Sequence, residues 1–177
     1  CYLIDVPTKD IQNTLPQVHV LGRGQVMHVS PDYSVLIDYA HNGVSFESII
    51  STVEQYNPNK LIVVYGSGGK RSKTRRYESG EVVAKHGGYS ILTADNPRGE
   101  KIVDICNDIV VGIDKYHGEY TIIPDRKEAI YHALDMAEKG DVVLLLGKGH
   151  ETYMIGEDEV TRHFSETEVL EEYKKER

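Results

Sequence analysis

The chain has 177 residues, of which 40% are hydrophobic and 27% are charged, and its formal net charge is -8. This composition predicts one globular domain with a core of its own. The acidic balance disfavours sequence-independent nucleic-acid binding, which needs a positive face against phosphates. No apolar run approaches the roughly 18–20 residues that span a bilayer, and no signal peptide is visible. We therefore expect a cytoplasmic protein without a membrane partner.

The chain begins at Cys1 without an initiator methionine, which indicates a piece of a longer polypeptide. We expect residues 1–17 to be the end of a preceding domain or a linker, and residues 18–177 to form the folded domain. Two cysteines do not make a disulfide framework. Cys106 falls in an apolar helical pattern, which indicates a buried thiol in a reducing compartment.

From residue 18 onward, strand-like and helix-like patterns alternate along the chain. The predicted strands cover residues 17–29 (bent or bulged at its two glycines), 34–40, 60–66, 89–94, 119–124 and 141–147. The predicted helices cover residues 44–55, 75–86, 102–113 and 126–139, the last closed by Gly140. Residues 152–164 read as a hairpin, and Ser165 with Glu168 predicts a capping box for a final helix.

This alternation predicts an α/β fold: a Rossmann-like, mostly parallel sheet with helices on both faces and a C-terminal antiparallel hairpin. The hairpin could add an antiparallel edge to the sheet. Ligands of such sheets bind outside the carboxyl ends of the strands. Four polar clusters follow four of the predicted strands, at residues 38–41, 66–71, 95–98 and 147–151. We expect them to converge on one site.

The glycine-rich segment GSGGKRS invites comparison with a phosphate-binding P-loop. That motif needs a glycine at position 64 and a serine or threonine at position 71, where this chain has Val64 and Arg71. We therefore interpret the glycines as a turn that a ligand or another backbone approaches closely. Five basic residues between Lys70 and Arg76 oppose the dipole of the helix that they begin. They are either solvated or neutralised by a bound anion.

The other clusters have two readings each. Asp38 either contacts a ribose or caps the next helix, and His41 could donate to a phosphate. GKGHE is either a tight turn with solvated side chains or a site where Glu151 binds an ammonium group. The histidines and cysteines lack metal-ligand spacing, and no serine suggests a hydrolytic triad, so we predict neither a metal site nor catalytic residues of that kind.

The segments LGRGQ, VLIDYAHN, VVYGSGGKRSKTRR, TADNPR, DRKEAI and LLLGKGHE occur in this order between Leu21 and Glu151. Together they resemble the C-terminal domain of the Mur ligases, and most closely the E-type, diaminopimelate-adding branch. The resemblance implies an ATP-dependent, ADP-forming ligase of peptidoglycan synthesis, and so of cell-wall biogenesis, cell shape and division. It would add meso-diaminopimelate to UDP-N-acetylmuramoyl-L-alanyl-D-glutamate.

The resemblance also implies what other parts of the polypeptide contribute. The central domain would hold the P-loop, the Mg²⁺ ligands and a carbamylated lysine, so this chain would carry no catalytic residue and would be inactive alone. Its partners would be the substrates and the N-terminal and central domains of the same polypeptide, which would act as a monomer. For nucleotide binding, the resemblance implies Arg23 near the phosphates, Asp38 at the ribose and His41 near the nucleotide.

For the incoming amino acid, the resemblance implies a contact with Arg76, recognition of the distal end by Asp95, Asn96 and Arg98, and binding of the distal carboxylate and amino group by Gly147 and Glu151. Diaminopimelate carries a second carboxylate that lysine lacks, and a guanidinium favours that carboxylate while repelling an ammonium group. Arg98 therefore predicts diaminopimelate.

Three alternatives stay open at this point. The first is a lysine-adding ligase of the same family, because Asn42-Gly43 replaces the usual Thr-Pro, as in some lysine-adding relatives. Gln25 also departs from the family pattern, since it replaces a usual glutamate and so removes a charge. The second is a folylpolyglutamate synthetase or cyanophycin-type relative, against which the DNPR and GKGHE segments argue. The third is a stand-alone module that binds a nucleotide or another anion without catalysis.

Overall fold

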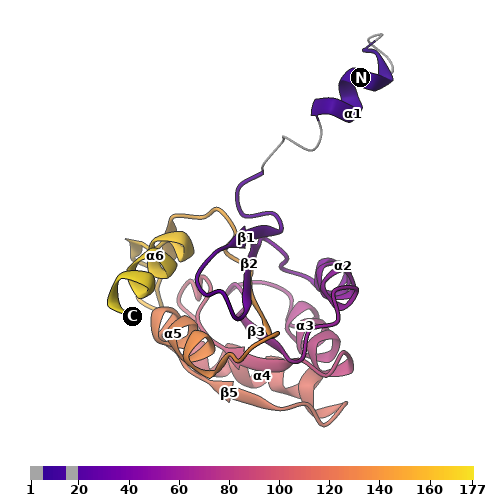
Figure 1. Cartoon of the computed structure of the whole chain (residues 1–177). Coiled ribbons are helices and arrows are strands. Elements are labelled where there is room, and N and C mark those ends of the chain that lie inside the picture. Colours follow the sequence, from indigo (N-terminus) through magenta and orange to yellow (C-terminus); the bar gives the residue numbers. More distant parts are fainter. Residues whose placement is uncertain (1–5, 15–19) are drawn as a thin grey trace.

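The computed structural model describes residues 6–14 and 20–177 (Figure 1). A six-stranded sheet with the order β1-β2-β6-β3-β4-β5 forms its centre. The strands are β1 (Gln25–Met27), β2 (Ser34–Asp38), β3 (Leu61–Tyr65), β4 (Tyr89–Leu92), β5 (Tyr120–Ile122) and β6 (Val142–Leu146). Every neighbouring pair is parallel except β1 with β2. The predicted α/β class with a mostly parallel sheet is confirmed.

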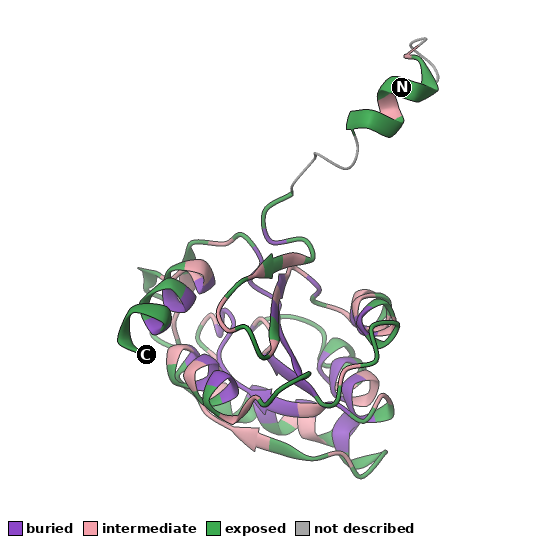
Figure 2. Ribbon diagram, in the orientation of Figure 1, coloured by how far each residue is buried: buried purple, intermediate pink, exposed green. Residues whose placement is uncertain are grey.

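Helices cover both faces of the sheet. The core on one face contains apolar residues of α2 (Gly43–Glu54), α3 (Lys73–Lys85) and α4 (Ile102–Asp114). The core on the other face contains residues of α5 (Arg126–Met136) and α6 (Glu166–Glu176). Strands β3 and β6 are buried at every position (Figure 2), which is why their sequences are continuous apolar runs.

Two helix starts differ from expectation. At α2, the Asn42 side chain accepts a hydrogen bond from Ser45 N at 3.0 Å, and the Ser45 hydroxyl reaches back to Asn42 N, so the full capping box lies here. At α6, Ser165 accepts from Glu168 N at 3.4 Å. The reciprocal half of that predicted box is absent from the described bonds, because the Glu168 carboxylate binds His163 instead.

Two predicted elements were wrong in extent, whereas the predicted C-terminal antiparallel hairpin is confirmed. The strand predicted at 17–29 is formed only at β1, because Gly22 and Gly24 take positive φ angles in a turn before it; residues 17–19 lie outside the described residues. The helix predicted to residue 139 ends at Met136, since Ala137 is extended. The hairpin strands β7 (Tyr153–Ile155) and β8 (Thr161–His163) form a sheet of their own and do not extend the main one.

The short helix α1 (Thr8–Thr14) contains no buried residue. The predicted boundary at residues 17–18 falls outside the described residues, so that division stays a prediction. Cys106 is a free, buried cysteine within the first core, as predicted, and Cys1 lies outside the described residues. Among the helices of the described ranges, none has the length and apolar character to cross a membrane.

Candidate functional site

Four loops meet at the carboxyl edge of the sheet, as the order of polar clusters predicts. They follow β2, β3, β4 and β6, and together with Arg75 of α3 they line a pocket of about 110 Å³. We call it the four-loop pocket; its lining includes His41, Ser67, Asp95, Arg98 and Gly147. Residues that are up to 112 positions apart in sequence therefore touch here, as Tyr39 and Glu151 do.

The glycines after β3 let two loops meet backbone to backbone. A Cβ atom on Gly66 would lie 2.1 Å from Thr93 O, and one on Gly69 would lie 1.7 Å from Pro97 O. Gly69 N also donates a hydrogen bond to Asn96 O at 2.8 Å. No side chain fits at either glycine, so the predicted close approach of another backbone is confirmed.

A buried network holds the acidic side of the pocket. Lys148 is fully buried, and its ammonium group donates to Glu151 Oε2 at 2.8 Å, to Asn96 Oδ1 at 3.4 Å and to Tyr153 O. Asn96 in turn donates to Asp95 Oδ1 and to Glu151 Oε2, both at 3.0 Å. Ile155 N donates to Asn96 Oδ1, so Asn96 uses its full hydrogen-bonding capacity inside the protein.

This network keeps Glu151 ionised. Burial alone would raise the pKa of Glu151, but hydrogen bonds from Lys148 and Asn96 and the charge of Lys148 lower it below its ordinary value. Its other oxygen, Oε1, accepts from the Tyr39 hydroxyl at 3.3 Å. Burial and the Glu151 charge raise the pKa of Tyr39, which keeps that hydroxyl a donor. The pocket thus presents a fixed carboxylate.

Three guanidinium groups line the same pocket: Arg71, Arg75 and Arg98. Within the described ranges, none of the three forms an ion pair with a carboxylate. Arg98 N donates to Ile155 O of the hairpin, which fixes its loop. Cations thus stand in one small cavity with the carboxylates of Asp95 and Glu151. Such a cavity matches a ligand that carries both a carboxylate and an ammonium group.

Arg76 lies elsewhere. Its side chain is 1% exposed and forms ion pairs of 2.9 Å with Asp108 and with Glu100, and it does not line the pocket. Lys73 also binds Asp108, and Lys70 binds Glu159. Carboxylates of the protein therefore neutralise three of the five basic residues at the start of α3. The substrate contact expected of Arg76 would require its buried guanidinium to leave two partly exposed carboxylates, those of Asp108 and Glu100.

The residues expected to bind a nucleotide surround Tyr39. The Arg23 guanidinium lies 4.8 Å from the centre of the Tyr39 ring, and the His41 ring lies 5.1 Å from it. The Asp38 carboxylate accepts hydrogen bonds of 2.7 Å from Gly24 N and from Ala40 N. Asp38 is not the cap of the next helix, since Asn42 has that role.

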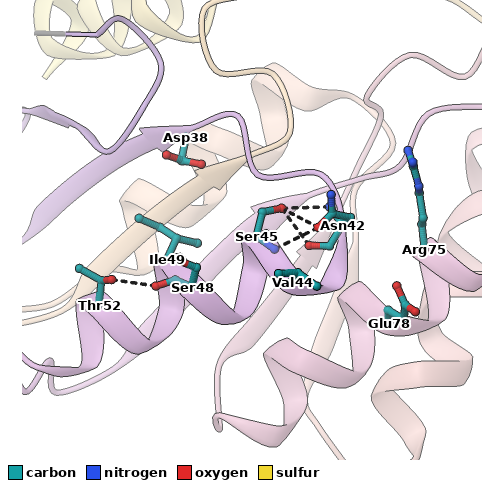
Figure 3. A pocket seen from close by; sticks show the side chains of 9 residues that line it. All are labelled: Asp38, Asn42, Val44, Ser45, Ser48, Ile49, Thr52, Arg75 and Glu78. Atoms are coloured by element: carbon teal, nitrogen blue, oxygen red, sulfur yellow. Dashed lines mark hydrogen bonds between the residues drawn. The ribbon is translucent and has the colours of Figure 1, made fainter. Parts of the chain in front are cut away.

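A second and larger hollow, which we call the α2 groove, adjoins the four-loop pocket. It measures about 720 Å³, and Figure 3 shows its residues along α2, with Asp38 to one side and Arg75 and Glu78 of α3 to the other. Hydroxyl groups of Ser45, Ser48 and Thr52 and the apolar side chains of Val44 and Ile49 share the lining. Arg75 lines both hollows and so connects them.

Sequence reasoning missed Arg71, Arg75 and Lys148 as site residues. The two arginines are among five consecutive or nearly consecutive basic residues, and the sequence does not indicate which of these side chains point toward the pocket. Lys148 lies between two glycines, a pattern that predicts a solvated lysine in a tight turn. Among the described residues, no group of three or more histidine, cysteine, aspartate or glutamate side chains is arranged to hold a metal ion.

Residues 22–149 match the family model described as Mur ligase, glutamate ligase domain. The chain belongs to the Mur ligase family. Its similar relatives include UDP-N-acetylmuramoyl-L-alanyl-D-glutamate--2,6-diaminopimelate ligases of Caldanaerobacter subterraneus, 40% identical over 169 residues, and of Clostridium perfringens, 41% identical over 171 residues. Each alignment covers 96% of this chain and 35% of the relative.

A solved structure of a ligase with the same name has a TM-score of 0.79 and 28% identity to this Mur ligase chain, covering 99% of it and 36% of the solved chain. A bifunctional folylpolyglutamate synthase/dihydrofolate synthase from Yersinia pestis has a TM-score of 0.63 at 20% identity over 81% of this chain and 32% of its own, which shows a shared fold. The chain thus spans about a third of the length of the relatives it matches.

Proposed function

We propose that this Mur ligase chain is part of an ATP-dependent ligase that adds meso-diaminopimelate to UDP-N-acetylmuramoyl-L-alanyl-D-glutamate in peptidoglycan synthesis. Residues 18–177 would be its C-terminal domain, acting in the cytoplasm with the remaining domains of the same polypeptide. The names of its relatives support the reaction. Because the chain covers about a third of their length, its own share is the binding and orientation of substrates.

The observation that carries the proposal is the mixed charge of the four-loop pocket. The distal carbon of meso-diaminopimelate bears a carboxylate and an ammonium group. Arg71 and Arg98 are unpaired cations within the described ranges and suit the carboxylate, while Glu151 and Asp95 suit the ammonium group. Lysine lacks the carboxylate, so it would leave both guanidinium groups of the pocket without an anionic partner. Asn96 and Lys148 hold the acidic side in place, and Gly147 leaves room beside Asp95.

The α2 groove and the Tyr39 surroundings suit a nucleotide. The Asp38 carboxylate and the hydroxyl groups along α2 are groups that bind ribose, and Arg23 and His41 can face phosphates. ATP would supply the phosphoryl group that activates the peptide carboxylate, with Mg²⁺ held by another part of the polypeptide. Arg75 borders both hollows, so it could contact both substrates as they meet.

The chemistry follows from this placement. Once the peptide carboxylate is an acyl phosphate, the amine of the incoming amino acid attacks the acyl carbon. The C–N bond forms first and gives a tetrahedral intermediate, which then expels inorganic phosphate as the C–O bond breaks, while the nitrogen loses a proton to the solvent. Binding the distal end in the four-loop pocket restricts where the reacting amine can lie, which lowers the entropic barrier. The groups that perform phosphoryl transfer would lie in the rest of the polypeptide.

The test compares amino acids and one arginine in the polypeptide that carries this chain. Wild type should ligate diaminopimelate in preference to lysine and ornithine. Arg98→Ala should raise KM for diaminopimelate roughly ten- to hundredfold, as expected for loss of a charge-assisted hydrogen bond, and leave KM for ATP unchanged.

Arg177→Ala is the matched control, because Arg177 is exposed and pairs only with Asp135 among the described carboxylates. Equal use of lysine and diaminopimelate by wild type would contradict the proposal. So would an Arg98→Ala variant in which KM for diaminopimelate and KM for ATP rise equally. Preferred use of lysine would instead support the lysine-adding alternative. Absence of any ligation would favour the stand-alone binding module.

A further inference from the structure

Arg126 is a buried cation beneath the four-loop pocket that the proposed function does not use. Arg126 is 2% exposed. It belongs to the segment DRKEAI, in which the sequence indicates no binding or catalytic residue. Its Nη1 donates to Ala94 O and its Nη2 to Leu146 O, both at 2.8 Å. These carbonyl groups immediately precede Asp95 and Gly147, the first pocket residues of their loops.

The two carbonyl groups belong to strands that are not neighbours. In the sheet order, β3 lies between β4 and β6, so no ladder of hydrogen bonds joins β4 to β6 directly. Adjacent strands lie about 4.8 Å apart, which puts these two strand ends roughly 10 Å apart. The two carbonyl oxygens lie closer together than the strand axes, because each accepts a 2.8 Å hydrogen bond from a different nitrogen of the same guanidinium. A planar guanidinium with donors on both sides can join them in this way, whereas the ammonium group of lysine is a compact charge.

Glu166, at the start of α6, fixes the orientation of the guanidinium. Its Oε1 accepts from Arg126 Nε at 3.1 Å and from Nη2 at 2.8 Å, and both side chains are fully buried. Removing two charges from water is costly, so a buried pair contributes little to net stability. What this pair does provide is a fixed direction for the two remaining contacts, toward Ala94 and Leu146.

We propose that Arg126 is a positioning residue, which sets the separation of the Asp95–Arg98 loop from the Gly147–Glu151 loop and thereby the fit of the amino acid. Arg126 itself does not line the pocket. The effect on substrate rests on the proposed function, while the effect on loop positions does not. The two parts are therefore measured separately.

The first measurement uses the 177-residue chain and needs no activity. Amide chemical shifts from NMR are compared for Arg126→Lys and for Leu134→Ala, a buried residue of the same helix that packs in the second core. We expect Arg126→Lys to shift the amides of residues 95–98 and 147–151, and Leu134→Ala to leave them in place. Shifts of equal size in both variants would overturn the proposal.

The second measurement uses the polypeptide that carries the chain. Arg126→Lys should raise KM for diaminopimelate about tenfold and change KM for ATP less than twofold. Leu134→Ala should leave both KM values unchanged. A uniform loss in both variants would overturn the positioning role. If wild type ligates no diaminopimelate, the proposed function fails, and the amide shifts alone decide whether Arg126 positions the loops.

If Arg126→Lys does not fold, the double variant Arg126→Met with Glu166→Leu takes its place. Replacing a buried pair by apolar residues of similar volume is often neutral or stabilising. This variant lacks the donors to Ala94 and Leu146, so the same loop amides should shift. Unshifted loops in the double variant would overturn the proposal.

Discussion

At the scale of single residues, the function of a charged side chain in this site depends on its burial. Lys148 and Asn96 read from sequence as candidates for solvent or substrate, yet Lys148 is fully buried and Asn96 is 3% exposed. Both side chains form their hydrogen bonds with other groups of the protein. They support Glu151 and Asp95, which line the four-loop pocket. The expected role of Asn96 in direct recognition stays a prediction, and its bonding favours support.

Replacing Lys148 by methionine tests this support. The change removes the ammonium group from three acceptors and leaves the Glu151 carboxylate without its buried partner. Breaking a buried pair in this way should destabilise the chain by about 3–5 kcal/mol. The check is urea unfolding of the 177-residue chain. Lys174→Met, which removes an exposed partner of Glu171, should change little, and an equal loss in both variants would contradict the buried role.

At the scale of elements, a polar contact outside the sheet joins α2 to the end of α3. His86 follows the end of α3 and binds two carboxylates of α2: its Nδ1 lies 2.8 Å from Glu54 and its Nε2 lies 3.0 Å from Glu47. Both ring nitrogens can donate only in the protonated ring. Burial lowers the pKa of His86, but hydrogen bonds and charge from these two carboxylates raise it above its ordinary value of 6.5.

This pair of contacts should make stability depend on pH. Because the pKa is higher in the folded chain than in the unfolded one, the stabilisation is complete below about pH 6.5. It is lost as pH rises from there through the folded pKa. We expect the difference in unfolding free energy between wild type and His86→Gln to be about 1 kcal/mol or less at pH 6 and to fall toward pH 8. Urea unfolding at several pH values measures it; a difference that grows with pH would refute it.

At the scale of the whole molecule, the chain has its own two-sided core but about a third of the length of its relatives. We expect the 177-residue chain to fold on its own and to show no ATP-dependent ligation. The physical reason is that phosphoryl transfer needs cations assembled around the phosphates, and this chain lacks the P-loop motif. Cooperative thermal unfolding would support the first part, and measurable ligation by the isolated chain would contradict the second.

The order of elements and the convergence of four loops could be predicted from sequence, because buried strands read as apolar runs and parallel strands share a carboxyl edge. The C-terminal hairpin was predicted as well, but its possible pairing with the edge of the main sheet does not occur, since its strands bond to each other. The strand predicted across Gly22 and Gly24 failed for a local reason, because positive φ angles interrupt it.

The sequence by itself determined the family, the α/β class and the four segments that build the site. Only the tertiary structure decided which arginines face the pocket. Arg75 and Arg76 are adjacent, and a helix rotates successive residues by about 100°. Arg75 therefore reaches both hollows, while Arg76 turns into the protein toward Asp108 and Glu100. The sequence shows which residue types follow one another, but the direction of a side chain depends on the tertiary contacts around it.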